Sequence, residues 1–195
     1  MDTNNSVTQN KIDALQTLAR EALACQKCNL CNTRTKLVFG EGSPDAKFMI
    51  IGEAPGEAED NMGRPFVGAA GRLLDGLLES IGLIRADIFI TNILKCRPPF
   101  NRNPAPIEEV SCVPFLDRQI AIIQPKVIIT LGNYATKYML DTDVGISKLH
   151  GNFYQNKNGR LIYPVYHPAA ALYHPKLRLD LKIDFRKLKG ILAQP

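Results

Sequence analysis

The chain has 195 residues, of which 45% are hydrophobic and 22% charged, and its formal net charge is +5 at pH 7. This length and composition suit one globular domain over residues 1–195, with residues 1–10 expected as a disordered tail. No run is apolar enough to span a membrane, and the polar start lacks a signal-peptide pattern. We therefore expect a cytoplasmic protein, and its positive charge favours nucleic acid as a partner.

Hydrophobic periodicity predicts helices and strands that alternate along the chain. The predicted helices cover residues 8–24, 68–81, 106–123, 133–140 and 175–192. The predicted strands cover residues 47–51, 88–94, 126–131 and 161–166. Pro114 lies within the third helix and is expected to break or restart it. The segment 37–44 is expected to form a short extended piece and a turn, and the segment 142–158 a loop or a hairpin.

The first three predicted strands are continuous apolar runs separated by helices, a pattern that is typical of a parallel sheet buried on both faces. Glu53, Asn92 and His167 each follow an apolar strand run. The carboxyl ends of parallel strands share one edge of the sheet, where α/β proteins build their sites. We therefore expect these three side chains to meet at that edge.

The segment 52–71 joins the first predicted strand to a helix and is longer than a plain connection needs. It holds five glycines, two prolines and four carboxylates, but neither a G-x-G-x-x-G pattern nor a P-loop lysine. We interpret it as a functional loop in which Glu53 and Glu59 supply carboxylates and Phe66 a stacking surface. The alternatives are solvated charges and a core phenylalanine. Asn92 likewise has two interpretations, since its amide fits a nucleobase edge or pins a neighbouring loop.

His167 precedes a proline and a run of small residues that ends at Leu172. Small residues let a bulky partner approach the backbone, and Leu172 is a candidate for an apolar wedge in DNA. A plain turn before the last helix is the alternative. That last predicted helix carries six Lys and Arg residues, which either form a solvated face or contact phosphates.

Five cysteines in a reducing compartment indicate metal or redox chemistry rather than disulfides. Cys25 and Cys28 have C-x-x-C spacing, whereas Cys96 and Cys112 flank one loop rich in proline and asparagine. Four thiolates can hold zinc or a [4Fe–4S] cluster. The spacing alone leaves both open, together with a redox pair and plain structural thiols. We interpret Cys31 as a bystander.

Taken in order, these motifs resemble the family-4 uracil-DNA glycosylases, the iron–sulfur branch of the uracil-DNA glycosylase superfamily. The resemblance covers about residues 25–172. It rests on the two cysteine pairs, the Phe39-Gly40-Glu41-Gly42 turn, the GEAPGEAED…GRPFVG loop, Thr91-Asn92, and His167-Pro168-Ala169-Ala170.

The resemblance implies a three-layer α/β/α sandwich around a four-stranded parallel sheet. It also implies an enzyme that flips uracil out of single- or double-stranded DNA and hydrolyses its N-glycosidic bond. The resulting abasic site would start base excision repair. The implied cofactor is a [4Fe–4S] cluster that holds structure and does not react with the base, with the ligands Cys25, Cys28, Cys96 and Cys112.

The same resemblance assigns roles to the residues of the strand ends. His167 would donate a hydrogen bond to uracil O2, Asn92 would read the O4 and N3 edge, and Phe66 would stack on the ring. Glu53 would orient the attacking water or stabilise the sugar cation, and Glu59 would crowd the C5 position, with these two roles open to exchange. The implied catalytic residues are Glu53, His167 and Glu59, and the implied uracil-binding residues are Glu53, Ala54, Phe66, Asn92 and His167.

Two other functions are open from the sequence. One is a DNA-binding or polymerase-associated module that keeps the fold without cleavage, and the other is an iron–sulfur electron carrier. The combination of Glu53, Asn92 and His167 favours the enzyme. We expect a monomer with a sliding clamp as a further partner, whereas the range of damaged bases and the choice between single and double strands are not predicted.

Overall fold

A computed structural model of the chain describes residues 2–192, with side-chain surroundings for residues 6–190. Its helices are α1 (Asp2–Leu23), α2 (Glu57–Met62), α3 (Ala69–Ser80), α4 (Pro106–Ile123), α5 (Gly132–Leu140), α6 (Ile146–Leu149), α7 (Pro168–Tyr173) and α8 (Pro175–Leu192). Its strands are β1 (Glu41–Gly42), β2 (Phe48–Gly52), β3 (Phe89–Asn92), β4 (Val127–Leu131), β5 (Tyr154–Gln155) and β6 (Leu161–Val165). Short 3-10 turns are η1 (Asn29–Asn32), η2 (Arg85–Asp87) and η3 (Pro99–Asn101).

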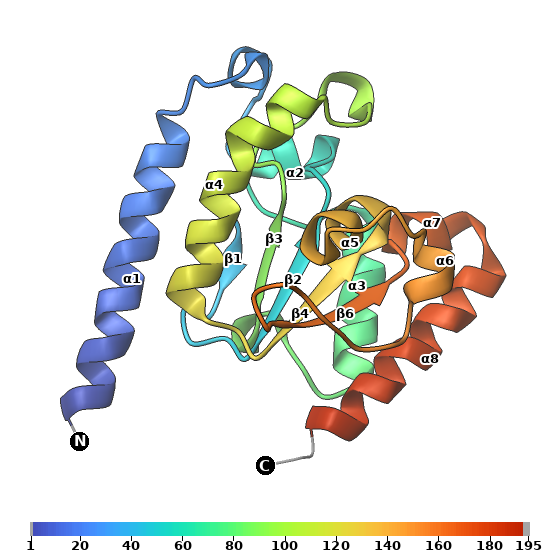
Figure 1. Cartoon of the computed structure of the whole chain (residues 1–195). Helices are drawn as coiled ribbons and strands as arrows, with labels where there is room; N and C mark the ends of the chain where they lie inside the picture. Colours follow the sequence, from blue (N-terminus) through green and yellow to red (C-terminus); the bar gives the residue numbers. More distant parts are fainter. Residues whose placement is uncertain (1, 193–195) are drawn as a thin grey trace.

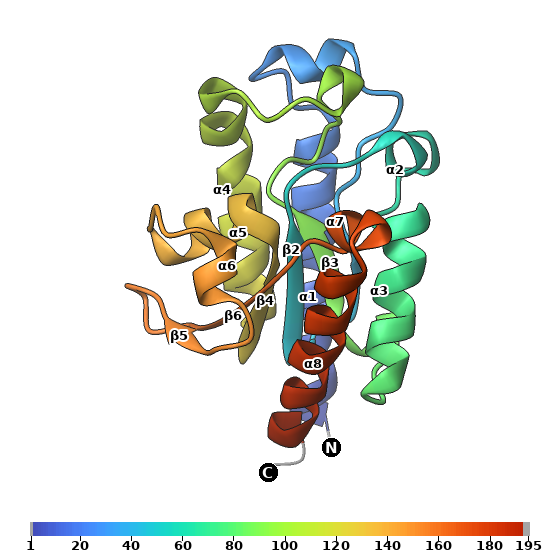
Figure 2. The same ribbon diagram turned by 90° about the vertical axis from the view of Figure 1, so that its right-hand side faces the viewer.

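The sheet lies between two layers of helices (Figures 1 and 2). Successive strand residues point to opposite faces, and the two cores follow this alternation. Ile50 and Ile129 belong to the core under α3, α7 and α8, whereas Ile51 and Ile128 belong to the core under α4 and α5. Helix α1 packs outside α4. The predicted three-layer α/β/α sandwich is therefore confirmed.

The inner strands β3, β2, β4 and β6 are parallel, as predicted. The predicted number of four strands was wrong, because within residues 2–192 the sheet has six strands in the order β1-β3-β2-β4-β6-β5. The additional strands, β1 and β5, pair antiparallel with β3 and β6 at the two edges. β1 lies in the segment expected as a short extended piece and a turn, and β5 forms a hairpin with β6, one of the two structures expected for residues 142–158. Neither was predicted as a strand of the sheet, because two residues carry no readable alternation.

Several helices also differ from the prediction. Helix α4 runs through Pro114 without a break. Proline removes the hydrogen bond to the carbonyl four residues earlier, but Pro114 and Val110 lie on the exposed face, where water can bind that carbonyl. Helix α1 begins at Asp2, within the stretch expected as a tail. The stretches 52–71 and 167–174, expected as loops, contain the short helices α2 and α7.

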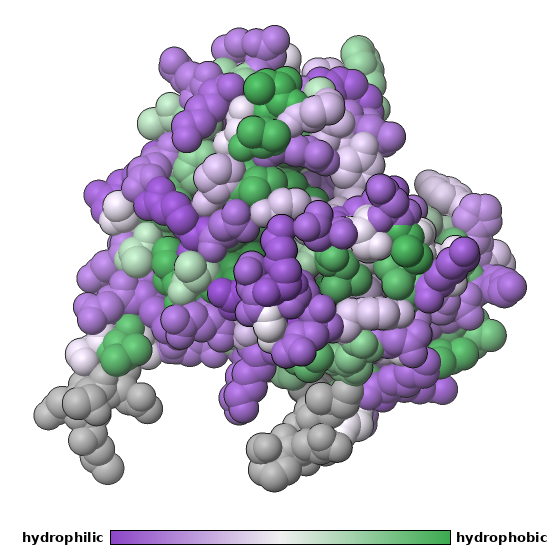
Figure 3. Space-filling model, viewed as in Figure 1, coloured by the Kyte–Doolittle hydropathy of each residue, from purple (hydrophilic) through white to green (hydrophobic). Residues whose placement is uncertain are grey.

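No helix within residues 2–192 is long and apolar enough to cross a membrane. The face of the molecule in Figure 3 is mostly hydrophilic, and its hydrophobic residues form small groups among the polar ones. Ile107 and Val110 on α4 are among the exposed hydrophobic side chains.

Candidate active site

A pocket of about 380 Å³ opens at the carboxyl ends of the parallel strands. This volume lies within the range of small-molecule sites, about 300–1,000 Å³. The strand-end residues expected to meet do so, because Glu53, Asn92 and His167 all line this pocket. The pocket is also lined by Ala54 and Phe66, which were expected to bind the base, and by Glu59, which was expected to be catalytic.

The register of β2 and β3 places the backbone segments that carry Glu53 and Asn92 next to each other. Gly52 at the end of β2 is paired with Asn92 at the end of β3, and the Leu94 N–H donates to the Glu53 carbonyl over 3.0 Å. A side chain at Gly52 would collide with the pocket wall, since its Cβ would lie 2.4 Å from Asn92 Oδ1 and 2.7 Å from Phe66 Cζ. Glycine at this position therefore lets the Asn92 amide and the Phe66 ring close around the strand end.

Asn92 presents a buried acceptor to the pocket. The residue is 1% exposed, and within the described part of the chain its Oδ1 atom has no hydrogen-bond partner. Its main-chain carbonyl accepts a 2.6 Å hydrogen bond from the buried Lys95 ammonium, which also binds Thr91 and Gln119. Buried polar atoms are nearly always satisfied, and the unpaired Oδ1 is an acceptor that an N–H group in the pocket can use.

His167 is held in one tautomer by the helix that follows it. It is the N-cap of α7, and its Nδ1 atom accepts a 3.1 Å hydrogen bond from the Ala169 N–H. Burial lowers the pKa of His167 to about 4, against a smaller opposing effect of the Glu59 carboxylate. The imidazole is therefore neutral at pH 7, and because Nδ1 accepts, the proton is on Nε2. The side chain offers a fixed N–H donor.

Phe66 forms one wall of the pocket from a strained backbone. Its φ angle of 52° lies in the left-handed region, which costs a non-glycine residue of the order of 1–3 kcal/mol. The ring is 5% exposed, and its centroid lies 5.8 Å from that of the His167 ring. Gly71 makes the turn possible, because a Cβ there would lie 1.8 Å from the Phe66 carbonyl oxygen.

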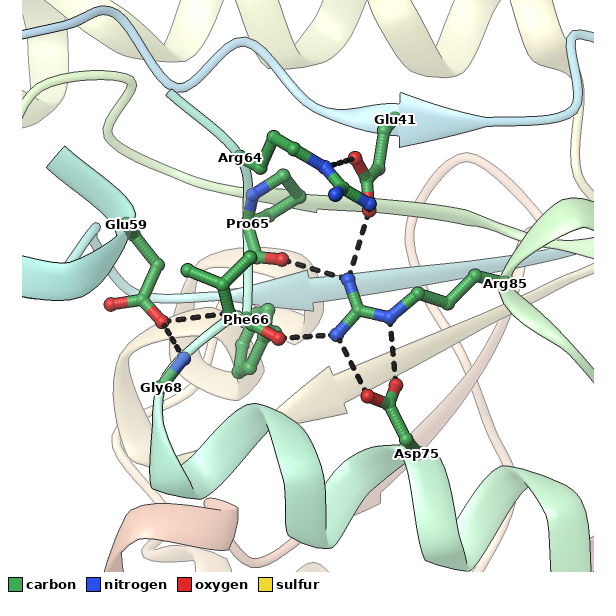
Figure 4. A network of polar contacts seen from close by, with 9 residues as sticks. Glu41, Glu59, Arg64, Pro65, Phe66, Gly68, Asp75 and Arg85 are labelled. Carbon is green, nitrogen blue, oxygen red and sulfur yellow. Dashed lines mark hydrogen bonds and ion pairs between the residues drawn. The ribbon is translucent and has the colours of Figure 1, made fainter. Parts of the chain in front are cut away.

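Arg85 of η2 braces this turn from outside the pocket (Figure 4). Its guanidinium donates to the carbonyl oxygens of Pro65, at 2.9 Å, and Phe66. The same group is held by Asp75 of α3 at 2.7 Å and Glu41 of β1 at 2.9 Å. Three separate elements therefore fix the backbone that carries the Phe66 ring.

The two candidate carboxylates have different surroundings. Glu59 Oε1 accepts 2.9 Å hydrogen bonds from the Val67 and Gly68 N–H groups, just before α3 begins. Among the described residues, the Glu53 carboxylate has no hydrogen-bond partner. Burial raises the pKa of Glu53, and the nearby Glu109 carboxylate raises it further. Glu53 is thus the carboxylate that is free to bind water, whereas Glu59 also supports the loop.

All five cysteines line a second cavity, between η1, the turn after β3 and α4. The Arg34 guanidinium donates to Cys96 Sγ, and the Lys95 backbone N–H donates to Cys112 Sγ, each over 3.2 Å. Burial raises the pKa of Cys112 to about 11. Within the described residues, no group of three or more His, Cys, Asp or Glu side chains has the arrangement to hold a metal ion. The sulfur-rich donor set itself suits zinc or an iron–sulfur cluster.

Cys31 has a different environment from the four predicted ligands. Its thiol lies 3.4 Å from Asn32 Oδ1, to which it donates a hydrogen bond. It lines the same cavity, so its position alone does not separate it from the other four.

The structure adds residues that sequence reasoning missed. Arg85 carries no motif, and its connection to Phe66 spans 19 residues, so no local pattern could have indicated it. Asn101 and Asn103, from the loop after Cys96, also line the pocket. Leu172, the candidate wedge, does not line the pocket but lies in a neighbouring groove, 39% exposed.

Comparison with known proteins agrees with this geometry. Residues 39–188 match the family described as the uracil DNA glycosylase superfamily. The chain is 48% identical over 192 residues to the type-4 uracil-DNA glycosylase of Sulfurisphaera tokodaii, covering 94% of this chain and 87% of the relative. It is 50% identical over 190 residues to that of Saccharolobus solfataricus, covering 93% and 88%. Identity to the type-5 uracil-DNA glycosylase of Thermus thermophilus is 30% over 179 residues, covering 79% and 81%.

Proposed function

This chain belongs to the family-4 branch of the uracil-DNA glycosylase superfamily, and on that premise we propose that it excises uracil from DNA. The enzyme flips the uracil nucleotide into the strand-end pocket, hydrolyses the N-glycosidic bond and leaves an abasic site that starts base excision repair. The observation that carries this proposal is the convergence of Glu53, Asn92 and His167 on one pocket of suitable volume.

Recognition of uracil falls to Asn92 and Phe66. The unpaired Asn92 Oδ1 accepts the N3–H of uracil, while the amide NH₂ group donates to O4. Cytosine has an amino group in place of O4 and no hydrogen on N3. Its amino group would therefore face the Asn92 NH₂ group, donor against donor, and its N3 would face Oδ1, acceptor against acceptor. The Phe66 ring stacks on the base. Glu59 crowds C5 and disfavours the methyl group of thymine, and its hydrogen bonds to the Val67 and Gly68 N–H groups keep it in place.

Bond cleavage places opposite charges on the two products. The electrons of the C1′–N1 bond leave with uracil, and the sugar becomes an oxocarbenium-like cation that water then attacks at C1′. His167 donates its Nε2–H to uracil O2, where negative charge grows, and the backbone N–H groups of Glu53 and Ala54 assist. The Glu53 carboxylate orients the water and takes up its proton.

An oligonucleotide that contains a single uracil tests both the activity and the assignment of Asn92. The protein is expected to release uracil, so that alkali then cleaves the strand at the abasic site, and to release cytosine from a matched oligonucleotide far more slowly. Asn92→Ala is expected to lower the preference for uracil over cytosine about 10- to 100-fold, because one bidentate base contact supplies roughly 1–3 kcal/mol of discrimination. The ratio of single-turnover rates on the two oligonucleotides measures this.

No release by the unmodified protein, at any strand type, would reject the glycosylase. Release by Asn92→Ala with its preference intact would retain the enzyme and reject the edge-reading role.

The second part of the proposal is a [4Fe–4S] cluster held by Cys25, Cys28, Cys96 and Cys112. The four cysteines line one cavity, and the N–H donors from Arg34 and the Lys95 backbone are the kind of groups that stabilise thiolates bound to iron. When bound, the cluster would tie the chain after α1 to α4 and to the turn after β3, and its contribution would be structural. Zinc is the alternative that the same donor set allows.

Metal analysis of variants tests this assignment independently of activity. Cys112→Ser is expected to lose most of the iron and acid-labile sulfide, together with the visible absorbance of the cluster, and to unfold at a lower temperature. Cys31→Ser is the matched control and is expected to keep all of them. Zinc in place of iron in anaerobically purified protein would contradict the cluster, and equal iron loss in both variants would contradict the choice of ligands.

The remaining predictions form part of the same proposal. We place the protein in the cytoplasm, associated with the nucleoid through its DNA substrate, as a single-domain monomer that a sliding clamp could recruit. The net charge of +5 and the free cysteines are consistent with that setting.

A further inference from the structure

A groove of about 630 Å³ runs between α3 and α8, on the face of the sheet that also carries α7. In Figure 2 the two helices lie side by side below α7. The floor is apolar, with Leu73 and Leu77 of α3. Four cationic side chains line the groove: Arg72, Arg178, Lys182 and Arg186.

The cations of α8 form a single row. Arg178, Lys182 and Arg186 are spaced four residues apart, so they lie on one face of the helix about 6 Å from one to the next. The facing row of α3 is Arg72, Gly76 and Ser80, in which the two small residues leave the groove open. One wall is thus a line of positive charge, and the other leaves room for a chain-like ligand.

These four charges are not neutralised within the described part of the chain. None of them takes part in an ion pair or a side-chain hydrogen bond there. Of the acidic residues on the two helices, Glu79 and Asp180 do not line the groove, and the other two are paired. Asp75 of α3 binds Arg85, and the buried Asp184 of α8 binds His150. An uncompensated row of arginine and lysine is the feature by which a protein surface attracts polyphosphate chains.

The groove begins next to the active-site pocket. Ala69 lines the groove while its neighbour Ala70 lines the pocket, and α7 starts at the pocket with His167 and brings Leu172 into the groove. A DNA strand with a nucleotide in the pocket therefore has the groove directly beside it.

We propose that the α3–α8 groove binds the phosphate backbone of DNA flanking the flipped nucleotide. One strand of a duplex presents a phosphate about every 3.4 Å along the axis, so each cation of the row reaches a phosphate. These contacts are independent of sequence and hold the strand in register, while the pocket selects the base. The proposal takes DNA as the ligand from the proposed function, but it concerns binding rather than excision.

The test is the salt dependence of binding to an undamaged duplex of defined length, measured by fluorescence anisotropy. Removing three phosphate contacts in R178Q/K182Q/R186Q is expected to raise the Kd and to make the slope of log K against log salt shallower by about 2–3. On a uracil duplex the KM should rise, with little change in the single-turnover rate at saturating DNA. R178K/R186K retains the charges and is expected to keep the slope of the unmodified protein.

The matched control removes three lysines from the opposite edge of the sheet. K47Q/K126Q/K157Q makes the same change in net charge, and Lys47 and Lys126 are exposed side chains that directly precede β2 and β4. It is expected to alter the slope by less than one. Equal slopes in the two triple variants, with equal thermal unfolding temperatures, would overturn the groove assignment. If the unmodified protein released no uracil, the proposed function would be rejected. The salt slopes of the variants would still show whether the groove binds DNA.

Discussion

Glu53→Gln is expected to slow uracil release from saturating DNA about 10²–10⁴-fold at neutral pH, which is the usual contribution of a positioned general base. Glutamine keeps the size of the side chain but can neither take up the proton of the attacking water nor face the sugar cation with a negative charge. Affinity for undamaged DNA should change little, because Glu53 lies inside the pocket and away from the cationic groove. Single-turnover rates and anisotropy measure the two quantities separately.

The pH dependence of uracil release is a second test of the role of Glu53. The reaction needs the Glu53 carboxylate ionised, and burial together with Glu109 raises its pKa above the ordinary value. Activity is therefore expected to be full above the raised pKa and to fall as the pH drops through it. Glu109→Gln removes the neighbouring charge, so the pKa of Glu53 should fall and the acidic limb should move to lower pH.

His167 does not account for that limb, since its pKa is lowered to about 4 and the imidazole stays neutral above this value. An acidic limb that persisted in Glu53→Gln at the same pH would contradict the assignment of the base, as would an unchanged rate in that variant at pH 7.

His167→Asn is expected to lower the single-turnover rate about 10²–10³-fold, the usual effect of removing one donor from a preorganised anion site. Asparagine is a good N-cap, so it keeps an acceptor for the Ala169 N–H while removing the donor that reaches uracil O2. His167→Ala should lose a similar factor in rate and, in addition, about 1 kcal/mol of stability from the lost cap.

The pair of variants separates chemistry from structure. If His167→Asn were as active as the unmodified protein while His167→Ala were slow, the imidazole would serve only as a helix cap. Thermal unfolding of both variants measures the capping contribution directly.

Sequence patterns predicted the parts of the molecule that repeat along the chain. The buried runs of β2, β3 and β4 gave the parallel sheet, and polar residues at strand ends gave the edge where Glu53, Asn92 and His167 meet. The two edge strands were expected only as an extended piece and as one arm of a possible hairpin, because two residues are too few to show a period. Pro114 was misjudged because its cost depends on exposure, which the sequence does not state.

The contacts that position the side chains of the site could not be predicted from the sequence, for a different reason. The unpaired Oδ1 of Asn92, the tautomer of His167 and the guanidinium that reaches the Phe66 carbonyl each depend on atoms brought together from distant segments. Glu59 is an example. Its place in the pocket was expected, but the hydrogen bonds that it accepts from the Val67 and Gly68 N–H groups were not.

The clamped turn at Phe66 has a thermodynamic consequence for base capture. Because Arg85 and its partners, Glu41 and Asp75, already hold the backbone that carries the ring, the entropy of ordering this turn is lost when the chain folds, not when a nucleotide arrives. A flipped pyrimidine thus stacks on a ring that is already ordered. The stacking free energy then stabilises the flipped-out state of the nucleotide. Residues of β1 and η2 therefore help to order the catalytic centre, although their side chains do not contact the base.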